Sequence, residues 1–219
     1  MLNLIRIYFP GLFSFLYCRL KCNKWDVQSG NSIKIINNAL LKGCRSKIDG
    51  NGNVIEISRS KLQFCNIHVV GNRNKIVISD DCCISHMTIH LEDDDNNIYI
   101  GRNVQIFGPV HIAAIEGTNI WIGDDCLFSQ NVNVRSGDSH SVIDSVSGNR
   151  INRSKAVTIG PHVWVGHSAM ILKGASIGHD SVVAAGAIVV GKQYPEGNII
   201  GGNPAKIIRE NITWDANRR

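Results

Sequence analysis

Aliphatic side chains recur at every sixth position through the C-terminal part of the chain. The series runs Ile159, Val165, Ile171, Ile177, Val183 and Val189. The residue four positions after each member is small or Val, except after the last: Val163, Ala169, Ala175, Ser181 and Ala187. A period of six does not fit a helix. It predicts a solenoid in which each hexad forms a short strand with the aliphatic side chain inside and then turns a corner at the small residue. Three hexads, about 18 residues, complete one turn of a triangular prism.

The same unit occurs more loosely earlier in the chain, as an aliphatic-x-Ile triplet followed by Gly or Ser. The closing residues of these triplets are 21, 22, 22 and 37 positions apart: Ile57, Ile78, Ile100, Ile122 and Ile159. The small excesses over about 18 residues predict polar corner turns, and the large one predicts a loop outside the stack, roughly Arg135 to Ser154. We therefore predict an apolar N-terminal segment over 1–30, a β-helix domain over 31–193 with a loop at 135–154, and a C-terminal extension over 194–219.

The composition of the 219 residues fits one folded domain with a continuous core, because 43% are hydrophobic and 19% charged. Twenty-one glycines against five prolines, with abundant Val and Ile, favour many short strands over a helical bundle. The net charge of +5 is spread without a run of like charges, which suits an anionic ligand better than nucleic acid. Seven cysteines without a C-x-x-C pair favour reduced thiols and a cytoplasmic protein.

The first 20 residues are the most apolar stretch of the chain. Arg6 and Pro10 interrupt it and leave it too short for a membrane-spanning helix. Its other basic residues, Arg19, Lys21 and Lys24, follow the apolar core, unlike those of a signal peptide. Two interpretations are open: a cap on the exposed end of the strands or on a neighbouring subunit, or a segment in the headgroup region of the inner leaflet.

The hexads resemble those of the hexapeptide-repeat acyltransferases, and two further stretches make the resemblance specific. Ser136-Gly-Asp-Ser-His-Ser-Val-Ile-Asp, continued by Gly148-Asn-Arg-Ile-Asn, looks like the acceptor loop of bacterial polysaccharide and sialic acid O-acetyltransferases. Gly201-Gly-Asn-Pro-Ala-Lys-Ile-Ile-Arg is similar to the family's closing segment. The resemblance implies an all-β fold, a left-handed parallel β-helix of about seven to eight triangular coils with one protruding loop. That hand is opposite to the usual right-handed crossover.

The resemblance also implies a function. A member of this family transfers acetyl from acetyl-CoA to a hydroxyl of a bacterial surface polysaccharide, such as a capsule, an O-antigen or a sialic acid-containing glycan. It works as a homotrimer without a metal ion, with the active site in the groove between neighbouring prisms. The expected partner is therefore a carbohydrate acceptor. One hypothesis is that this acceptor is attached to a lipid at the inner face of the membrane. Nucleic acid is not expected.

His140 is the predicted catalytic residue. Attack of a sugar hydroxyl on a thioester needs a base that is neutral near pH 7, and imidazole meets that need. His140 lies in the one long loop, with Arg135 and Asp138 before it and Asp144 after it, so that a carboxylate is at hand to fix its tautomer. Direct attack is expected, because the nearest cysteine, Cys126, occupies a small-residue position of the hexad pattern and is interpreted as core.

Coenzyme A needs backbone groups for its pantetheine amides and positive charge for its 3′-phosphate. The resemblance carries these roles to five residues: Ser168, Gly186, Gly191, Lys192 and Arg209. Gly191 departs from the family, where Thr is frequent at this position. Trp164 is expected to form a wall for the pantetheine arm or the acceptor.

Three other readings stay open. His162 and His167, with His111 as a third ligand, suggest a zinc enzyme like the γ-class carbonic anhydrases, which metal analysis would reveal. N-acetylation of an amino sugar nucleotide would call for an acidic base and a nucleotide-binding domain, and no such domain is visible. A non-catalytic structural β-helix would not need the acceptor loop.

Overall fold

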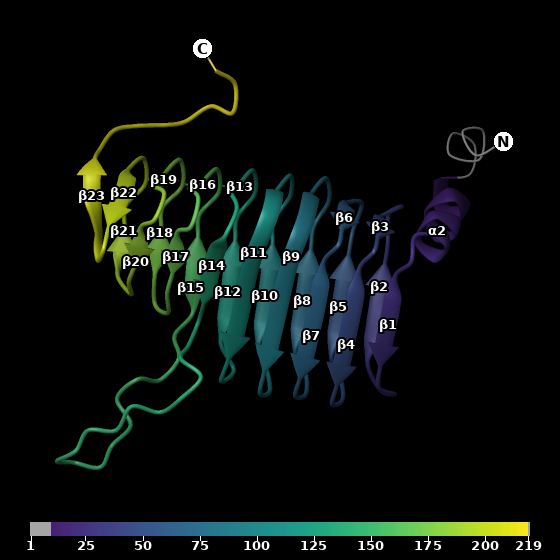
Figure 1. Cartoon of the computed structure of the whole chain (residues 1–219), viewed down its shortest axis with the longest axis horizontal. Helices are drawn as coiled ribbons and strands as arrows, with labels where there is room; N and C mark the ends of the chain where they lie inside the picture. The colour runs from purple at the N-terminus through teal and green to yellow at the C-terminus, as the bar shows by residue number, and fades with distance from the viewer. Residues whose placement is uncertain (1–9, 219) are drawn as a thin grey trace.

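The computed structural model describes residues 10–218 and arranges them as a parallel β-solenoid with three flat faces (Figure 1). The first face contains β2 (Ser32–Ile35), β5 (Val54–Ile57), β8 (Lys75–Ile78), β10 (Asn97–Ile100), β12 (Asn119–Ile122), β15 (Val157–Ile159), β18 (Ser176–Ile177) and β21 (Gln193–Tyr194). These eight stacked strands mark the successive coils of the described chain.

Two long strands, β9 (Cys83–Glu92) and β11 (Gln105–Ile115), bend around a corner and belong to both remaining faces. The second face adds β3 (Leu40–Lys42), β6 (Lys61–Gln63), β13 (Leu127–Phe128), β16 (Trp164–Val165), β19 (Val182–Val183) and β22 (Ile199–Gly202). The third face adds β1 (Lys24–Val27), β4 (Arg45–Asp49), β7 (Asn66–Val70), β14 (Val132–Arg135), β17 (Met170–Ile171) and β20 (Ile188–Val189).

Three corners join the faces, and we name them by what they connect. The first corner, between the first and second faces, includes His162 and Asp180. The second corner, between the second and third faces, includes Ser168 and Gly186. The third corner, between the third and first faces, carries the turns at 50–53, 71–74 and 93–96 and the long loop.

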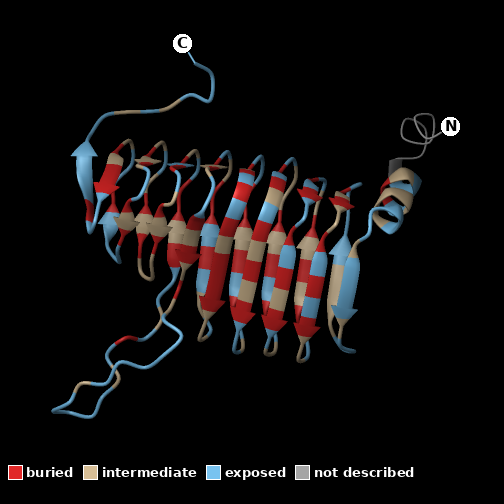
Figure 2. Cartoon of the chain, in the orientation of Figure 1, coloured by how far each residue is buried: buried red, intermediate tan, exposed pale blue. Residues whose placement is uncertain are grey.

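Neighbouring coils pair in register, and the register follows the triplet spacing. The closing isoleucines of the triplets face one another in sequence: Ile57, Ile78, Ile100, Ile122 and Ile159. Burial alternates along the strands, with inward residues buried and outward residues exposed (Figure 2). Both the aliphatic and the small members of the hexad series are 0–1% exposed, which confirms the predicted core.

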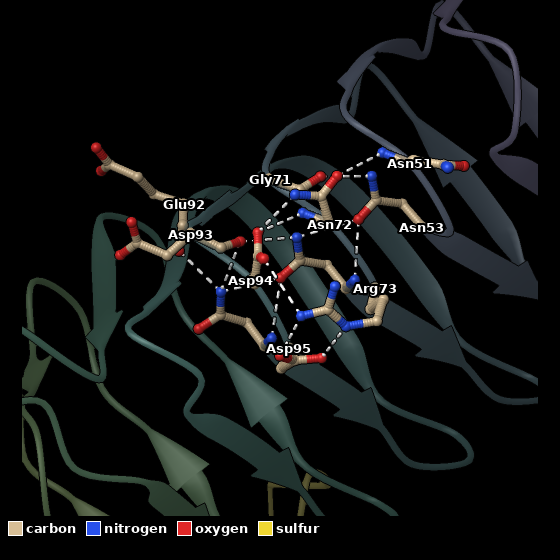
Figure 3. Close-up of polar contacts among 11 residues, drawn as sticks. Asn51, Asn53, Gly71, Asn72, Arg73, Glu92, Asp93, Asp94 and Asp95 are labelled. Atoms are coloured by element: carbon tan, nitrogen blue, oxygen red, sulfur yellow. Dashed lines mark hydrogen bonds and ion pairs between the residues drawn. The ribbon is translucent and has the colours of Figure 1, made fainter.

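Asparagines stacked at the third corner hold the wider N-terminal coils together (Figure 3). The main-chain N–H and the Nδ2 of Asn74 donate to Asn53 Oδ1 at 2.9 and 3.1 Å, and those of Asn96 donate to Asn74 Oδ1 at 2.9 Å each. All three asparagines are at most 1% exposed. Gly71 is required here, since its φ is +134° and a Cβ would lie 2.0 Å from the carbonyl oxygen of Asp93.

Each end of the solenoid carries a closing element. Helix α2 (Pro10–Leu20) packs on the first coil, where Ser14 Oγ donates to the Ala39 carbonyl at 2.5 Å and the Leu41 N–H donates to Cys18 Sγ at 3.4 Å. Strand β23 (Ala205–Arg209) pairs antiparallel with β22. No helix within residues 10–218 is long and apolar enough to cross a membrane. The start of the predicted N-terminal segment, residues 1–9, lies outside the described residues.

The strand ladder extends past both predicted domain boundaries. It begins at β1, before residue 31, and continues through β22, beyond residue 193. The first coil therefore includes part of the predicted 1–30 segment, and the last coil takes in the start of the predicted C-terminal extension.

Candidate active site

The loop between β14 and β15 leaves the third corner as a long arm (Figure 1). Its outer part is a hairpin in which the Ile151 N–H donates to the Val142 carbonyl at 2.9 Å. The carboxylate of Asp144 closes the turn by accepting the N–H of Ser147 at 2.7 Å and that of Val146 at 3.2 Å. These hydrogen bonds lower the pKa of Asp144, with the Ser147 backbone as the largest cause.

Asn152 organises the base of this arm and is 9% exposed. Its Nδ2 donates to the His140 carbonyl at 2.7 Å and to Asp138 Oδ2 at 2.9 Å, while its Oδ1 accepts the Val142 N–H at 2.7 Å. Lys173, from the coil below, contacts the Asp138 carboxylate and donates to the Asn152 carbonyl at 3.0 Å. The backbone of His140 is therefore held by the framework of the prism.

A second anchor ties the arm to the turn that precedes β12. Arg150 and Glu116 form an ion pair at 2.5 Å, and the Ser154 N–H donates to Glu116 Oε2 at 3.1 Å. Both side chains of the ion pair are largely shielded from solvent, at 21% and 28% exposure. Such a pair is worth more than one between fully exposed side chains.

The imidazole of His140 is exposed and, among residues 10–218, has no hydrogen-bond partner. Asp138 is engaged by Lys173 and Asn152, and the hydrogen bond from Lys173 is the main reason why the pKa of Asp138 is lowered. Asp144 serves the turn of the hairpin. Neither carboxylate forms a hydrogen bond with the imidazole within one protomer.

Arg135 and Trp164, the other predicted acceptor-loop residues, lie apart from His140. Arg135 ends β14 on the third face, near His111. The pKa of His111 is lowered mainly by the burial of its own imidazole and, to a smaller extent, by the positive charge of Arg135. Trp164 lies on the second face and donates from Nε1 to Ser129 Oγ at 3.3 Å. The second face is opposite the third corner, from which the arm leaves. A single chain therefore does not bring Trp164 and His140 together.

The predicted coenzyme residues occupy two corners and the closing strand. Ser168 and Gly186 stack at the second corner, where the Gly186 N–H donates to the His167 carbonyl at 2.8 Å. A Cβ on Gly186 would meet nothing within 4 Å, so this edge is open. Lys192 follows Gly191 at the third corner, and Arg209 ends β23 opposite Ile199.

The departure at Gly191 has a steric reason. A Cβ at this position would lie 2.6 Å from the carbonyl oxygen of Lys173, a residue that anchors the arm. Real Cβ atoms essentially never approach backbone so closely. Glycine therefore lets the last coil close against the coil that carries Lys173.

The histidines of the zinc alternative are widely separated within the chain. His162 lies at the first corner with Nδ1 2.7 Å from Asp180 Oδ1, whereas His111 lies on the third face. Within residues 10–218, no group of three or more His, Cys, Asp or Glu side chains is arranged to hold a metal ion. Cys126 is 1% exposed, and burial raises the pKa of its thiol to about 12, in keeping with a core position.

Sequence reasoning missed the four side chains that anchor the arm: Glu116, Arg150, Asn152 and Lys173. Two of them, Arg150 and Asn152, lie inside the stretch that resembles the family's acceptor loop. That resemblance was the signal that could have identified them. Glu116 and Lys173 occupy outward positions of the coils, where any polar residue fits the pattern.

Comparison with known proteins agrees with this architecture. No family model matches the chain. It is 33% identical over 186 residues to the polysialic acid O-acetyltransferase of Neisseria meningitidis, covering 75% of this chain and 86% of that protein. Among solved structures, the polysialic acid-specific acetyltransferase NeuO superposes with a TM-score of 0.84 at 30% identity, covering 89% of each chain. The polysialic acid O-acetyltransferase OatWY superposes with a TM-score of 0.82 at 30% identity, covering 90% of this chain and 92% of that one. The chain therefore belongs to the hexapeptide-repeat acetyltransferases and is an O-acetyltransferase with the left-handed β-helix fold.

Proposed function

We propose that this protein transfers acetyl from acetyl-CoA to a hydroxyl of a bacterial surface polysaccharide, with His140 as the general base. The observation that carries the proposal is the anchored arm, which fixes the backbone of His140 while leaving its imidazole exposed. The relatives named above are polysialic acid O-acetyltransferases, which supports a polysaccharide acceptor. The candidates are a capsule, an O-antigen or a sialic acid-containing glycan.

The chemistry assigned to His140 is a direct transfer. Neutral imidazole takes the proton of the sugar hydroxyl as its oxygen attacks the thioester carbonyl, and the C–S bond then breaks to release the coenzyme thiolate. The imidazolium returns the proton to that thiolate. A covalent acyl-enzyme on Cys126 is disfavoured, because its thiol is buried and its pKa is raised to about 12.

We assign the coenzyme to the groove that begins at the second corner. The open edge at Ser168 and Gly186 offers backbone groups to the pantetheine amides. The exposed cation Arg209, which ends β23, suits the 3′-phosphate, and Lys192 at the third corner would reach this groove from a neighbouring copy. Trp164 on the second face would then form the wall beside the thioester.

We propose that the protein works as a homotrimer, which the positions of these residues support. The arm leaves one corner of the prism, and Trp164 lies on the face opposite that corner. A site that contains both His140 and Trp164 therefore needs His140 from one copy and Trp164 from another. Cyclic symmetry with three copies gives each prism one such neighbour on either side.

We also assign the N-terminal end to the cytoplasmic face of the membrane. Helix α2 exposes Leu12, Phe15 and Leu20 at 50%, 59% and 70%, next to the basic residues Arg19 and Lys21. Apolar side chains flanked by cations suit the headgroup region of an anionic leaflet. Such contact would bring the enzyme to an acceptor carried on a lipid.

The experiment is to measure release of coenzyme A thiol over a panel of oligosaccharides and sialosides, with an amino sugar nucleotide included. The proposal expects release with at least one hydroxyl acceptor and an ester-linked acetyl group in the product. Release with the amino sugar nucleotide alone would establish N-acetylation instead. Failure to consume acetyl-CoA with every acceptor would favour a structural β-helix, and stoichiometric zinc would favour the carbonic anhydrase reading.

A further inference from the structure

The C-terminal tail folds back over the solenoid after β23 (Figure 1). Three hydrogen bonds tie it down: the Ile212 N–H donates to the Gly197 carbonyl at 2.9 Å, Thr213 Oγ1 donates to Asp180 Oδ1 at 3.2 Å, and Trp214 Nε1 donates to the His162 carbonyl at 2.7 Å. The tail is therefore positioned by the framework.

His162 and Asp180 form the platform on which the tail rests. His162 Nδ1 lies 2.7 Å from Asp180 Oδ1, and His179 Nδ1 lies 2.6 Å from Asp180 Oδ2. The ring of His162 stacks on Trp214 with centroids 4.4 Å apart and planes 13° from parallel. Trp214 thus has a fixed orientation, as a side chain must have if it is to recognise a ligand.

The tail and the first corner enclose a cleft of about 360 Å³. Its lining includes Asn103, Gln105, Asp125, Leu127 and Trp214. The Trp214 ring centroid lies 6.1 Å from that of Trp164, the side chain assigned to the active-site wall. The cleft is therefore next to the place where the reacting hydroxyl would lie.

The chemistry of the lining indicates an uncharged sugar. An indole offers a flat apolar surface to the C–H face of a pyranose, and amide and carboxylate groups bind its hydroxyls. The described lining contains no Lys or Arg, and its ionisable side chains include Asp125 and His162, whose Nδ1 lies 2.7 Å from Asp180 Oδ1. The carboxylate of Asp125 would repel the carboxylate of a sialic acid residue.

We propose that this cleft binds an uncharged, hydroxyl-rich sugar residue of the acceptor chain, adjacent to the residue that is acetylated beside Trp164. This assignment rests on the proposed transfer to a polysaccharide and narrows its substrate. The acceptor would then be a chain in which the acetylated sugar has a neutral neighbour, rather than a uniform polymer of sialic acid.

Binding in the absence of acetyl-CoA tests the cleft directly. Saturation-transfer NMR on the full chain would use three probes: maltohexaose, a hexamer of N-acetylglucosamine, and an α2,8-linked hexamer of sialic acid. We expect at least one neutral hexamer to bind, and both Trp214→Ala and Gln105→Ala to weaken that binding about 5- to 10-fold. The control is Trp121→Ala on the first face, because Trp121 is a solvent-accessible tryptophan that does not line the cleft. It should leave binding unchanged.

Two results would overturn the proposal: binding of no neutral hexamer, or binding of the sialic acid hexamer that depends on Trp214. Kinetics separate this proposal from the proposed function. With an active polymeric acceptor, Trp214→Ala should raise the acceptor KM and leave kcat and the acetyl-CoA KM almost unchanged. If no acceptor is acetylated but a neutral hexamer still binds through Trp214, the transferase proposal fails and the cleft stands. If transfer proceeds with an unchanged acceptor KM in Trp214→Ala, the cleft assignment fails alone.

Discussion

At the scale of single residues, the arm combines a fixed backbone with an unengaged side chain at His140. The Asn152 Nδ2 holds the His140 carbonyl at 2.7 Å, whereas the imidazole stays exposed. A general base needs this combination, because it must be in place before the substrate arrives and still be able to accept a proton.

Replacing His140 by Ala should lower kcat roughly 10²–10⁴-fold with little change in the acetyl-CoA KM, since a general base acts in the transition state. The control is His86→Asn, at an exposed corner of the N-terminal half where the φ of +57° tolerates Asn. Steady-state kinetics with both substrates measure the effect. Near-normal turnover in a folded His140→Ala protein would remove His140 from the mechanism.

We propose Lys173 as a positioning residue for the same site. Lys173→Met should detach Asp138 and Asn152 and lower kcat by up to about 10²-fold, because small displacements of a catalytic group are costly. Lys173→Arg keeps the charge and should restore most of the activity. Limited proteolysis should cut the arm faster in Lys173→Met. Unchanged kcat together with unchanged cleavage would show that the anchor is not needed.

The same anchor makes the base of the arm sensitive to acid. Lys173 lowers the pKa of Asp138, so the contact contributes fully above the ordinary Asp pKa of about 3.9 and is lost as the pH falls through the lowered value. The rate at which a protease cleaves the arm of the wild-type protein should therefore increase only in acid, where it should approach the rate measured for Lys173→Met.

At the scale of elements, the stacked asparagines of the third corner replace apolar contacts with hydrogen bonds. The Oδ1 of Asn74 accepts the main-chain N–H and the Nδ2 of Asn96, so Asn74→Ala leaves the buried main-chain N–H of Asn96 without its acceptor. The main-chain N–H of residue 74 still donates to Asn53 Oδ1 in that variant. Asn74→Ala should lower the free energy of unfolding by about 1–3 kcal/mol. Asn51→Ala, at an exposed position of the neighbouring turn at 50–53, should have little effect. Chemical denaturation compares them, and equal stabilities would contradict a structural role for the ladder.

One side of helix α2 packs against the first coil and the other faces solvent. The cap and the membrane interpretations can therefore be tested separately. Ser14 is 6% exposed against the first coil, whereas Leu12 and Phe15 point to solvent. The double variant Leu12→Ser with Phe15→Ser should keep the Tm of the wild type and lose sedimentation with anionic liposomes at low salt. Phe107→Ser is the control, because Phe107 is 50% exposed on β11. If the wild-type protein does not sediment with the liposomes, helix α2 serves only as a cap on the first coil.

The fold was largely predictable because every inward position of a coil must be filled by a side chain of matching size. That requirement shows in the sequence as the hexads and the triplets. The ladder ends were missed because β1 is mostly exposed and shows no alternation, and because Tyr194 replaces an aliphatic residue in the last coil. The anchors of the arm were missed because Lys173 and Asp138 are 35 residues apart, and only the path of the arm brings them together.

At the scale of the whole molecule, a shared site predicts complementation between inactive subunits. His140→Ala and Trp164→Ala proteins should each be nearly inactive, but trimers assembled from an equal mixture should regain about a quarter of the wild-type activity. In such a mixture, about a quarter of the interfaces combine an intact His140 from one subunit with an intact Trp164 from its neighbour, because each subunit type is present at one half. Light scattering should give the mass of a trimer. Active protein at the monomer mass, or no recovery in verified mixed trimers, would contradict a shared site.

The 37-residue step between Ile122 and Ile159 closes in the same register as the ordinary steps before it. An insertion at a corner therefore changes neither the pitch of the stack nor its interior. Mutation can lengthen or reshape the outer hairpin of the arm, beyond its anchors to Glu116 and Lys173, without disturbing the strand ladder. The second corner, which we assign to the donor, is not affected by such changes. On the proposed assignment, the part of the site that carries His140 can therefore change in evolution while the part that binds the donor is conserved.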